Sequence, residues 1–262
     1  MRTGQGAEGR AGTRAASAVL LPADLPADDL TRLSAAAEYV RVRESDALLP
    51  LLLPGLDGPE LRTLTERCRF EHAALVVFPP DPRALRADLA ACGLTAAAPP
   101  RPSVVVRERL ALRHRRDAKD LDVRILRPGA YGPDGSRRVV EVFTLVVPPG
   151  SALTAIAAHE RVHEHEAHLA FEVDRPDGPA LRGLCASFVR HGAVADGGGY
   201  NPHENGTVLY FTAPAAANAG YRRVELHADG DHRDVLAAHL DGHRARRPAT
   251  NDRGPRRQRG SP

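Results

Sequence analysis

The amino-acid sequence predicts an α+β fold that contains two consecutive βαβββ units. The order of the elements is the first observation, because strand, helix and three further strands follow one another twice between residues 70 and 242. An internal repeat is the second: PRALR at 82–86 stands 96 residues before GPALR at 178–182, and His72 stands 96 residues before His168. Each unit also ends on a strand in which Arg-Arg precedes one acidic residue, Glu141 or Glu225.

The first unit is assigned to residues 70–150. HAALVVF at 72–78 predicts a buried strand that begins at its histidine and is closed by two prolines. A helix is expected over 82–92, with proline in its first turn and Gly93 after its end. Residues 104–112 alternate between apolar and polar and predict a strand; 121–126 and 137–147 predict two more.

The second unit is assigned to residues 168–242. HLAFEV at 168–173 predicts a strand, and a helix is expected over 179–191, before Gly192. Residues 193–196 are expected to supply a short strand, followed by a glycine-rich loop, GGGYNPHENG. Strands over 207–212 and 221–227 complete the unit.

The remaining segments are assigned to an extension, a linker and two tails. Residues 18–69 predict a helical N-terminal extension, with helices over 28–41 and 59–68 and a short apolar segment over 47–53. Residues 151–167 predict a linker. Residues 1–17 and the arginine-rich 243–262 are poor in apolar side chains and are expected to be disordered.

Composition and charge favour a soluble, cytoplasmic protein. Hydrophobic residues make up 42% of the chain and charged residues 26%, and no apolar run approaches the ~20 residues that span a bilayer. Three cysteines cannot form a disulfide framework. The tail carries a net charge of +6 and residues 1–17 a net charge of +2, which leaves −5 of the total of +3 for residues 18–242. The charge distribution therefore predicts no nucleic-acid partner, and the lack of a long apolar run predicts no membrane partner.

Four repeated residues predict a shared metal site: His72, Glu141, His168 and Glu225. Glu141 stands in the strand VVEVFTLVV, where its same-face neighbours Val139 and Phe143 are apolar. A buried carboxylate without a partner costs several kcal/mol, so a cation, a metal or strong hydrogen bonds must accompany it. Imidazole and carboxylate ligands suit one divalent ion among Fe, Ni, Co, Mn and Zn, and the sequence does not choose among these.

The sequence resembles the vicinal oxygen chelate superfamily. HLAFEVD, ALRGLCASFVRHGA and GTVLYFTAPAAANAGYRRVELHA are similar to its HxAFxV … YFxDPxGxxxEL pattern, although the Asp-Pro-Asp-Gly turn is degenerate here. The superfamily includes glyoxalase I, extradiol dioxygenases, fosfomycin-resistance proteins and sugar or acyl-CoA epimerases. The resemblance covers residues 70–240 and is weaker in the first unit.

The resemblance implies two half-barrels around one divalent metal. His72, His168 and Glu225 correspond to a two-histidine, one-carboxylate triad, and Glu141 corresponds to the fourth ligand of the glyoxalase I and epimerase branches. A small oxygenated substrate would chelate the metal through two oxygens, and Glu141 or Glu225 would transfer a proton. Such units could also pair between two chains, so a homodimer is an open alternative.

Three other functions stay open at this stage. If Glu141 lies outside the metal shell, a non-haem Fe(II) dioxygenase is expected instead of an isomerase, epimerase or lyase. Some members of the fold bind or sequester a small molecule without catalysis. HERVH at 159–163 also matches the HExxH pattern of zinc proteases, although a solvated linker helix is the preferred interpretation of this histidine-rich segment.

Four further residues are candidates for substrate contacts. His203 and Asn205 stand in the glycine-rich loop, which could reach over the mouth of a cavity. Arg138 and Arg223 stand near the two glutamates and could bind an anionic substrate. The alternatives are a plain connecting loop for His203 and Asn205 and a solvent-exposed position for Arg138 and Arg223.

Overall fold

The computed structural model describes residues 25–96 and 98–246. The helices are α1 (Ala27–Val42), α2 (Ser45–Leu52), α3 (Gly58–Arg67), α4 (Ala84–Ala91), α5 (Val104–His114), the 3₁₀ helix η1 (Ala118–Asp120), α6 (Thr154–His163), α7 (Gly178–Arg190) and α8 (Arg233–Arg246). The strands are β1 (Cys68–Val77), β2 (Arg101–Pro102), β3 (Val123–Leu126), β4 (Gly129–Tyr131), β5 (Arg137–Leu145), β6 (His168–Val173), β7 (Val194–Asn201), β8 (Gly206–Thr212) and β9 (Arg223–Asp229). No helix among these residues is long and apolar enough to cross a membrane.

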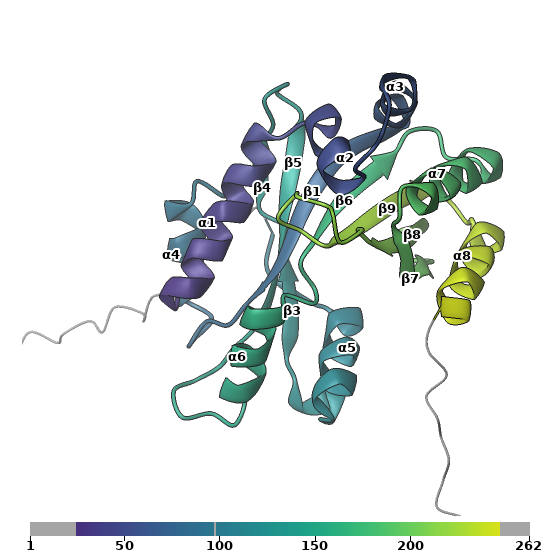
Figure 1. The fold of residues 1–262 in the computed structure, drawn as a ribbon. Helices are drawn as coiled ribbons and strands as arrows, with labels where there is room; N and C mark the ends of the chain where they lie inside the picture. The colour runs from purple at the N-terminus through teal and green to yellow at the C-terminus, as the bar shows by residue number, and fades with distance from the viewer. Residues whose placement is uncertain (1–24, 97, 247–262) are drawn as a thin grey trace, which may run out of the picture.

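The strands form a single nine-stranded sheet with two halves of similar topology, β1–β5 and β6–β9 (Figure 1). The order is β2-β3-β5-β1-β6-β9-β8-β7, and β4 pairs with β5 outside this path. In each half the first strand pairs in parallel with the last, β1 with β5 and β6 with β9, and antiparallel strands continue outwards. The two βαβββ units are thus confirmed.

The two halves join at an antiparallel seam between β1 and β6. Ala73 pairs with Leu169 near one end of this seam, and the pairs on either side are Ala74 with His168 and His72 with Ala170. The register therefore relates the two units by a local twofold axis through the Ala73–Leu169 pair. This relation brings the same positions of both units to one place on one face of the sheet.

The two faces of the sheet carry different cores. One face carries the larger core, to which α1, α2, α3, α4, α7 and α8 contribute side chains. The other face carries a smaller core, in which Val106 and Leu110 of α5 and Ile156 of α6 pack on Ala74 and Phe143. Both α5 and α6 lie at the bottom of Figure 1 and cover this second face at one end only.

Three local predictions were wrong. Residues 104–114 form helix α5 rather than a strand, because Val106, Leu110 and Ala111 bury one helical face. β1 begins at Cys68, so His72 lies inside its strand rather than at the start. The glycine-rich segment is in part strand, since β7 continues to Asn201 and only residues 202–205 turn back into β8.

The ends of the chain lie largely outside the described residues. The disorder expected for residues 1–17 concerns residues that the structure does not describe. α8 extends to Arg246, four residues into the segment that was expected to be a disordered tail.

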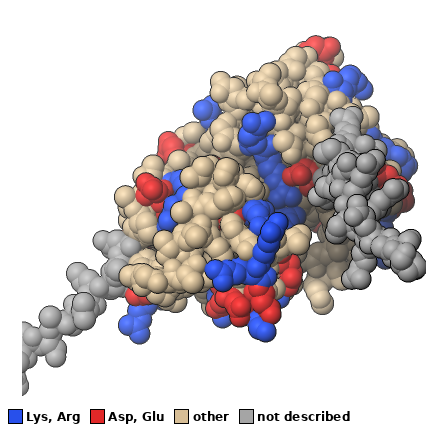
Figure 2. Space-filling model, turned by 60° about the horizontal axis from the view of Figure 1, so that its bottom comes forward, with Lys and Arg blue, Asp and Glu red and all other residues tan. Residues whose placement is uncertain are grey.

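Charged side chains of both signs lie close together on the face that carries α5 and α6 (Figure 2). Beneath this surface, Arg109 and Arg113 of α5 pair with the buried carboxylates of Glu166 and Glu160. This face therefore combines compensating charges with large uncharged areas.

Candidate metal centre

The four predicted ligands stand in two adjacent rows across the centre of the sheet. In the first row, Ala74 of β1 pairs with Glu141 of β5 on one side and with His168 of β6 on the other. The side chain of Ala74 is small, so the longer side chains on both sides can reach towards each other above it.

The second row repeats this arrangement with the units exchanged. Ala170 of β6 pairs with His72 of β1 on one side and with Glu225 of β9 on the other. Each row therefore holds one histidine and one glutamate from different units, separated by an alanine.

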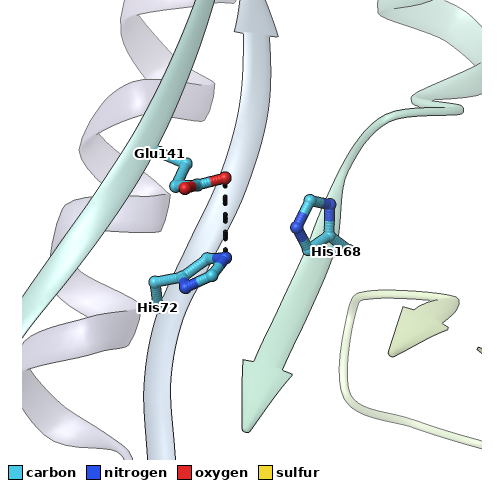
Figure 3. A group of neighbouring side chains, drawn as sticks. All are labelled: His72, Glu141 and His168. Atoms are coloured by element: carbon cyan, nitrogen blue, oxygen red, sulfur yellow. Dashed lines mark ion pairs between the residues drawn. The ribbon is translucent and has the colours of Figure 1, made fainter. Parts of the chain in front are cut away.

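The side chains of these rows approach one another in a buried group, of which Figure 3 shows His72, Glu141 and His168. His72 Nε2 lies 3.6 Å from Glu141 Oε2, and His168 Nε2 lies 3.2 Å from Glu225 Oε2. Potential ligand atoms of His72, Glu141 and His168 all lie within 4.8 Å of one another. The exposed fractions are 7% for His72, Glu141 and Glu225 and 3% for His168.

Both imidazoles are oriented with one nitrogen towards the centre of the group. His168 Nδ1 lies 2.8 Å from the carbonyl oxygen of Glu166 and donates to it, which leaves the lone pair on Nε2. His72 Nδ1 faces Glu71 Oε2 at 3.4 Å. The Nε2 atoms of both histidines are buried and make no hydrogen bond. Two orphaned imidazole nitrogens beside two carboxylates fit the ligand set of a divalent metal ion.

A β-bulge at Glu71 supplies the outer partner of His72. Phe70 pairs with Phe171 and His72 with Ala170, so Glu71 is an extra residue in β1. The bulge directs the Glu71 carboxylate to its neighbour His72 and also to His227 Nδ1, 3.7 Å away.

The charges of the group are strongly coupled. Burial tends to lower the pKa of His72, but Glu141, Glu71 and Glu225 outweigh it and raise this pKa to about 9. Burial tends to raise the pKa of the Glu225 carboxyl, but His168, His72 and Tyr210 hold it at about 2. Carboxylates thus outnumber histidines in this buried group, and their negative charge favours a bound cation or a protonated imidazole.

The two glutamates have different neighbours, which breaks the symmetry between the units. Glu225 is paired across the ladder with the half-buried Tyr210. Glu141 instead receives a hydrogen bond of 2.6 Å from Arg127 Nε, and Arg127 Nη1 lies 3.3 Å from Glu204 in the β7–β8 turn. About half of the Arg127 side chain is exposed, so Glu141 has a hydrogen-bond partner that reaches the solvent.

The structure places the expected substrate contacts in different surroundings. Arg223 lies on the same face as Glu225, its Nε 3.1 Å from Asp196 Oδ2 and its guanidinium 4.0 Å from the centre of the Tyr210 ring. Arg138 is buried away from the metal group and donates to the end of α1, so the structure does not bring it to the site.

The two residues of the glycine-rich segment lie at the β7–β8 turn. His203 is exposed, and its backbone N–H donates to Asn201. Asn205 adopts a left-handed conformation with φ 49° and accepts a hydrogen bond from the Tyr200 hydroxyl. Their contacts are those of the turn itself, while neighbouring Glu204 reaches Arg127 and thereby the metal group.

The HExxH motif lies on α6 in a second, separate cluster. Its Glu160 is 1% exposed and accepts hydrogen bonds from Arg113 and His114. A general base must reach a water and its substrate, and this carboxylate is enclosed by its own partners. The geometry therefore disfavours the protease alternative.

Sequence reasoning missed Glu71, Arg127, Tyr210 and His227. The alternation of side chains along β8 and β9 could have indicated two of them. His227 is two residues from Glu225 on the same face of β9, and Tyr210 of β8 pairs with Glu225. Glu71 and Arg127 reach the site through a bulge and a loop, which leave no periodic signal.

Comparison with known proteins gives no matching family model and no matching curated protein. Solved structures with some similarity include a methylmalonyl-CoA epimerase, with 14% identity and a TM-score of 0.36 over 62% of this chain and 95% of that chain. A Streptomyces coelicolor methylmalonyl-CoA epimerase variant in complex with 2-nitronate-propionyl-CoA shows 13% identity and a TM-score of 0.35, over 63% of this chain and 99% of that chain. A glyoxalase I mutant from Zea mays shows 13% identity and a TM-score of 0.21, over 64% of this chain and 70% of that chain. At these identities and TM-scores the matches carry no weight for the family or activity of this chain. The fold and the site themselves define a two-unit βαβββ protein with a buried His₂Glu₂ group.

Proposed function

We propose that this protein is a divalent-metal-dependent enzyme that moves a proton next to a carbonyl group of a small oxygenated metabolite. Isomerase, epimerase and lyase reactions share this step. The observation that carries the proposal is the pair of buried, unbonded Nε2 atoms, on His72 and His168, that face Glu141 and Glu225. A bound metal would supply Lewis-acid stabilisation of the negative charge that develops on the substrate oxygens.

The surroundings of the two glutamates assign them different roles. Glu225 is enclosed by His168 and Tyr210, two neighbours that hold it in place as a ligand. Glu141 contacts the half-exposed Arg127, whose side chain can move without opening the core. Glu141 is therefore the residue that we assign to proton transfer, with Arg127 positioning its carboxylate.

One observation favours the dioxygenase alternative. The Arg127–Glu141 ion pair satisfies one oxygen of Glu141 and could hold this residue outside the metal shell. His72, His168 and Glu225 would then be the three ligands of a non-haem Fe(II) site. The mutual approach of His72, Glu141 and His168 within 4.8 Å supports the four-ligand arrangement over this one.

The metal content of purified variants tests the ligand set. His168→Ala and Glu225→Ala should each lose one equivalent of metal relative to the unmodified chain while circular dichroism stays unchanged. Glu172→Gln is the matched control, because Glu172 lies on β6 but pairs with Arg69 at the surface. Full metal content in both ligand variants would refute the centre.

The reaction class is tested by hydrogen exchange in D₂O. The metal-loaded protein is incubated with hydroxyketones, 2-oxo acids and acyl thioesters, and deuterium at the carbon next to the carbonyl is followed by NMR. Glu141→Gln should slow the exchange by roughly 10²–10⁴-fold, the usual contribution of a general base. Oxygen uptake with catechols by the iron-loaded protein, without deuterium exchange in any substrate, would replace this proposal by the dioxygenase. Metal binding with neither activity would leave a binding protein.

A further inference from the structure

A second group of histidines lies where α5 and α6 meet, outside the candidate metal centre. This α5–α6 histidine cluster consists of His114, His159, Glu160, His163 and His165. It includes the HExxH motif, for which the proposed function has no use.

The imidazole rings of the cluster are packed against one another. The ring centroid of His159 lies 5.0 Å from that of His114, 4.3 Å from that of His163 and 5.5 Å from that of His165. His159 and His163 are one helical turn apart, so α6 presents both on the same side. His114 comes from the last turn of α5 and His165 from the segment after α6, so three separate parts of the chain contribute.

Ligand atoms are already close together and partly unsatisfied. Potential ligand atoms of His114, His159 and Glu160 lie within 4.8 Å of one another. Glu160 Oε2 and His159 Nδ1 are both buried and have no hydrogen-bond partner. Because Glu160 as a whole is 1% exposed, Oε2 is shielded from solvent and accepts no hydrogen bond from the protein. Such a buried, unsatisfied oxygen is unfavourable without a ligand.

We propose that the α5–α6 histidine cluster is a second metal site, which binds Zn²⁺ through His114, His159 and Glu160, with His163 or His165 completing the shell. Imidazole-rich sets with one carboxylate suit zinc, and tetrahedral ligand atoms stand roughly 3.3 Å apart at the usual Zn–N distance. Glu160 Oε1 lies 2.6 Å from His114 Nε2 and 3.6 Å from His159 Nδ1, so both imidazole nitrogens are already near this separation from the carboxylate. Glu160 acts here as a ligand, unlike the glutamate of an HExxH protease.

Zinc at this place would join α5 to α6. Both helices pack on the sheet face that carries the candidate metal centre, and both share the smaller core. Arg113 donates to Glu160 and also to Glu166, whose carbonyl group accepts from His168. Two ion pairs of Arg113 and one hydrogen bond of His168 therefore connect the zinc site to the candidate metal centre.

Zinc binding to the full chain tests this site independently of the proposed function. After removal of metal with a chelator, equilibrium dialysis against Zn²⁺ should show one equivalent fewer for His159→Ala, or an affinity at least about tenfold weaker, than for the unmodified chain. His168→Ala should lose a different equivalent, and the double variant should lose both. His203→Ala is the matched control, since His203 is an exposed histidine outside both groups.

A second measurement covers the case of a variant that does not fold. Zn²⁺ should protect His159 and His163 of the unmodified chain from diethyl pyrocarbonate, as mapped by mass spectrometry, while His203 stays reactive. The site is refuted if His159→Ala binds zinc like the unmodified chain. It is equally refuted if zinc gives His159 and His163 no more protection than His203.

Discussion

Arg138 is predicted to stabilise the fold by tying α1 to the sheet, and its replacement by methionine measures this contribution. Its side chain is 1% exposed, donates to the carbonyl oxygens of Val40 and Arg43, and pairs with Glu44 Oε2 at 2.6 Å. These carbonyl groups end α1, where positive charge is favourable. Met keeps an unbranched apolar side chain but removes every donor and the guanidinium, which lies 5.2 Å from the centre of the Phe70 ring.

The expected loss follows from the groups that remain without a partner. Each carbonyl that loses its donor costs about 1–3 kcal/mol. The lost pair with Glu44, whose side chain is 35% exposed, costs less than the about 3–5 kcal/mol of a fully buried pair, and a buried charge is also removed. We expect Arg138→Met to lower the free energy of unfolding by about 3 kcal/mol in urea titrations. Exposed Arg137, the preceding residue of β5, is the matched control, and Arg137→Met should change the free energy of unfolding by less than about 0.5 kcal/mol. A loss below about 1 kcal/mol for Arg138→Met, or equal losses in both variants, would refute the role.

Three further predictions address the metal centre and the docking of α1. Glu71→Gln should weaken metal binding at the centre about 10–100-fold in competition titrations, because it removes the outer partner of a ligand, and an unchanged affinity would contradict this role. In the metal-stripped protein, the depressed pKa of Glu225 (4.5 to about 2) contributes stability that is lost as the pH falls from 4.5 towards 2. The raised pKa of His72 (6.5 to about 9) contributes stability that is lost as the pH rises from 6.5 through 9. The Tm should therefore be highest between about pH 4.5 and 6.5, and a Tm that still rises up to pH 9 would contradict the assignment. Asp29→Asn should lower the free energy of unfolding by about 3 kcal/mol in the same urea titration. The Asp29 carboxylate is fully buried and accepts hydrogen bonds from Arg161 and from the backbone N–H of Phe78, directly after β1. Asp28→Asn, at an exposed position, is the control and should leave this energy nearly unchanged.

The repeat could be predicted from the sequence because equivalent residues of the two units recur at a fixed separation. The 96-residue offset of His72 and His168, together with one acid in each closing strand, predicted that the same positions of both units would meet. The seam between β1 and β6 shows why: a twofold relation of the two strands brings equivalent residues to one face.

The parts that were missed depend on tertiary contacts. Three successive valines favour a strand at the start of α5, but burial of Val106, Leu110 and Ala111 against the sheet overrides this local preference. Arg138 looked like a possible partner of substrate because it stands near Glu141 in sequence, yet three positions along a strand place it on the opposite face.

The seam between the two units has a consequence for folding as well as for chemistry. Each unit alone provides only one histidine and one glutamate, so neither can hold a metal ion with the full set. A ligand that binds the joined state and not the separated one stabilises the contact between the parts by mass action. Metal loading should therefore make both halves unfold in one cooperative transition. A destabilising substitution in either half should then lower the stability of the other half as well.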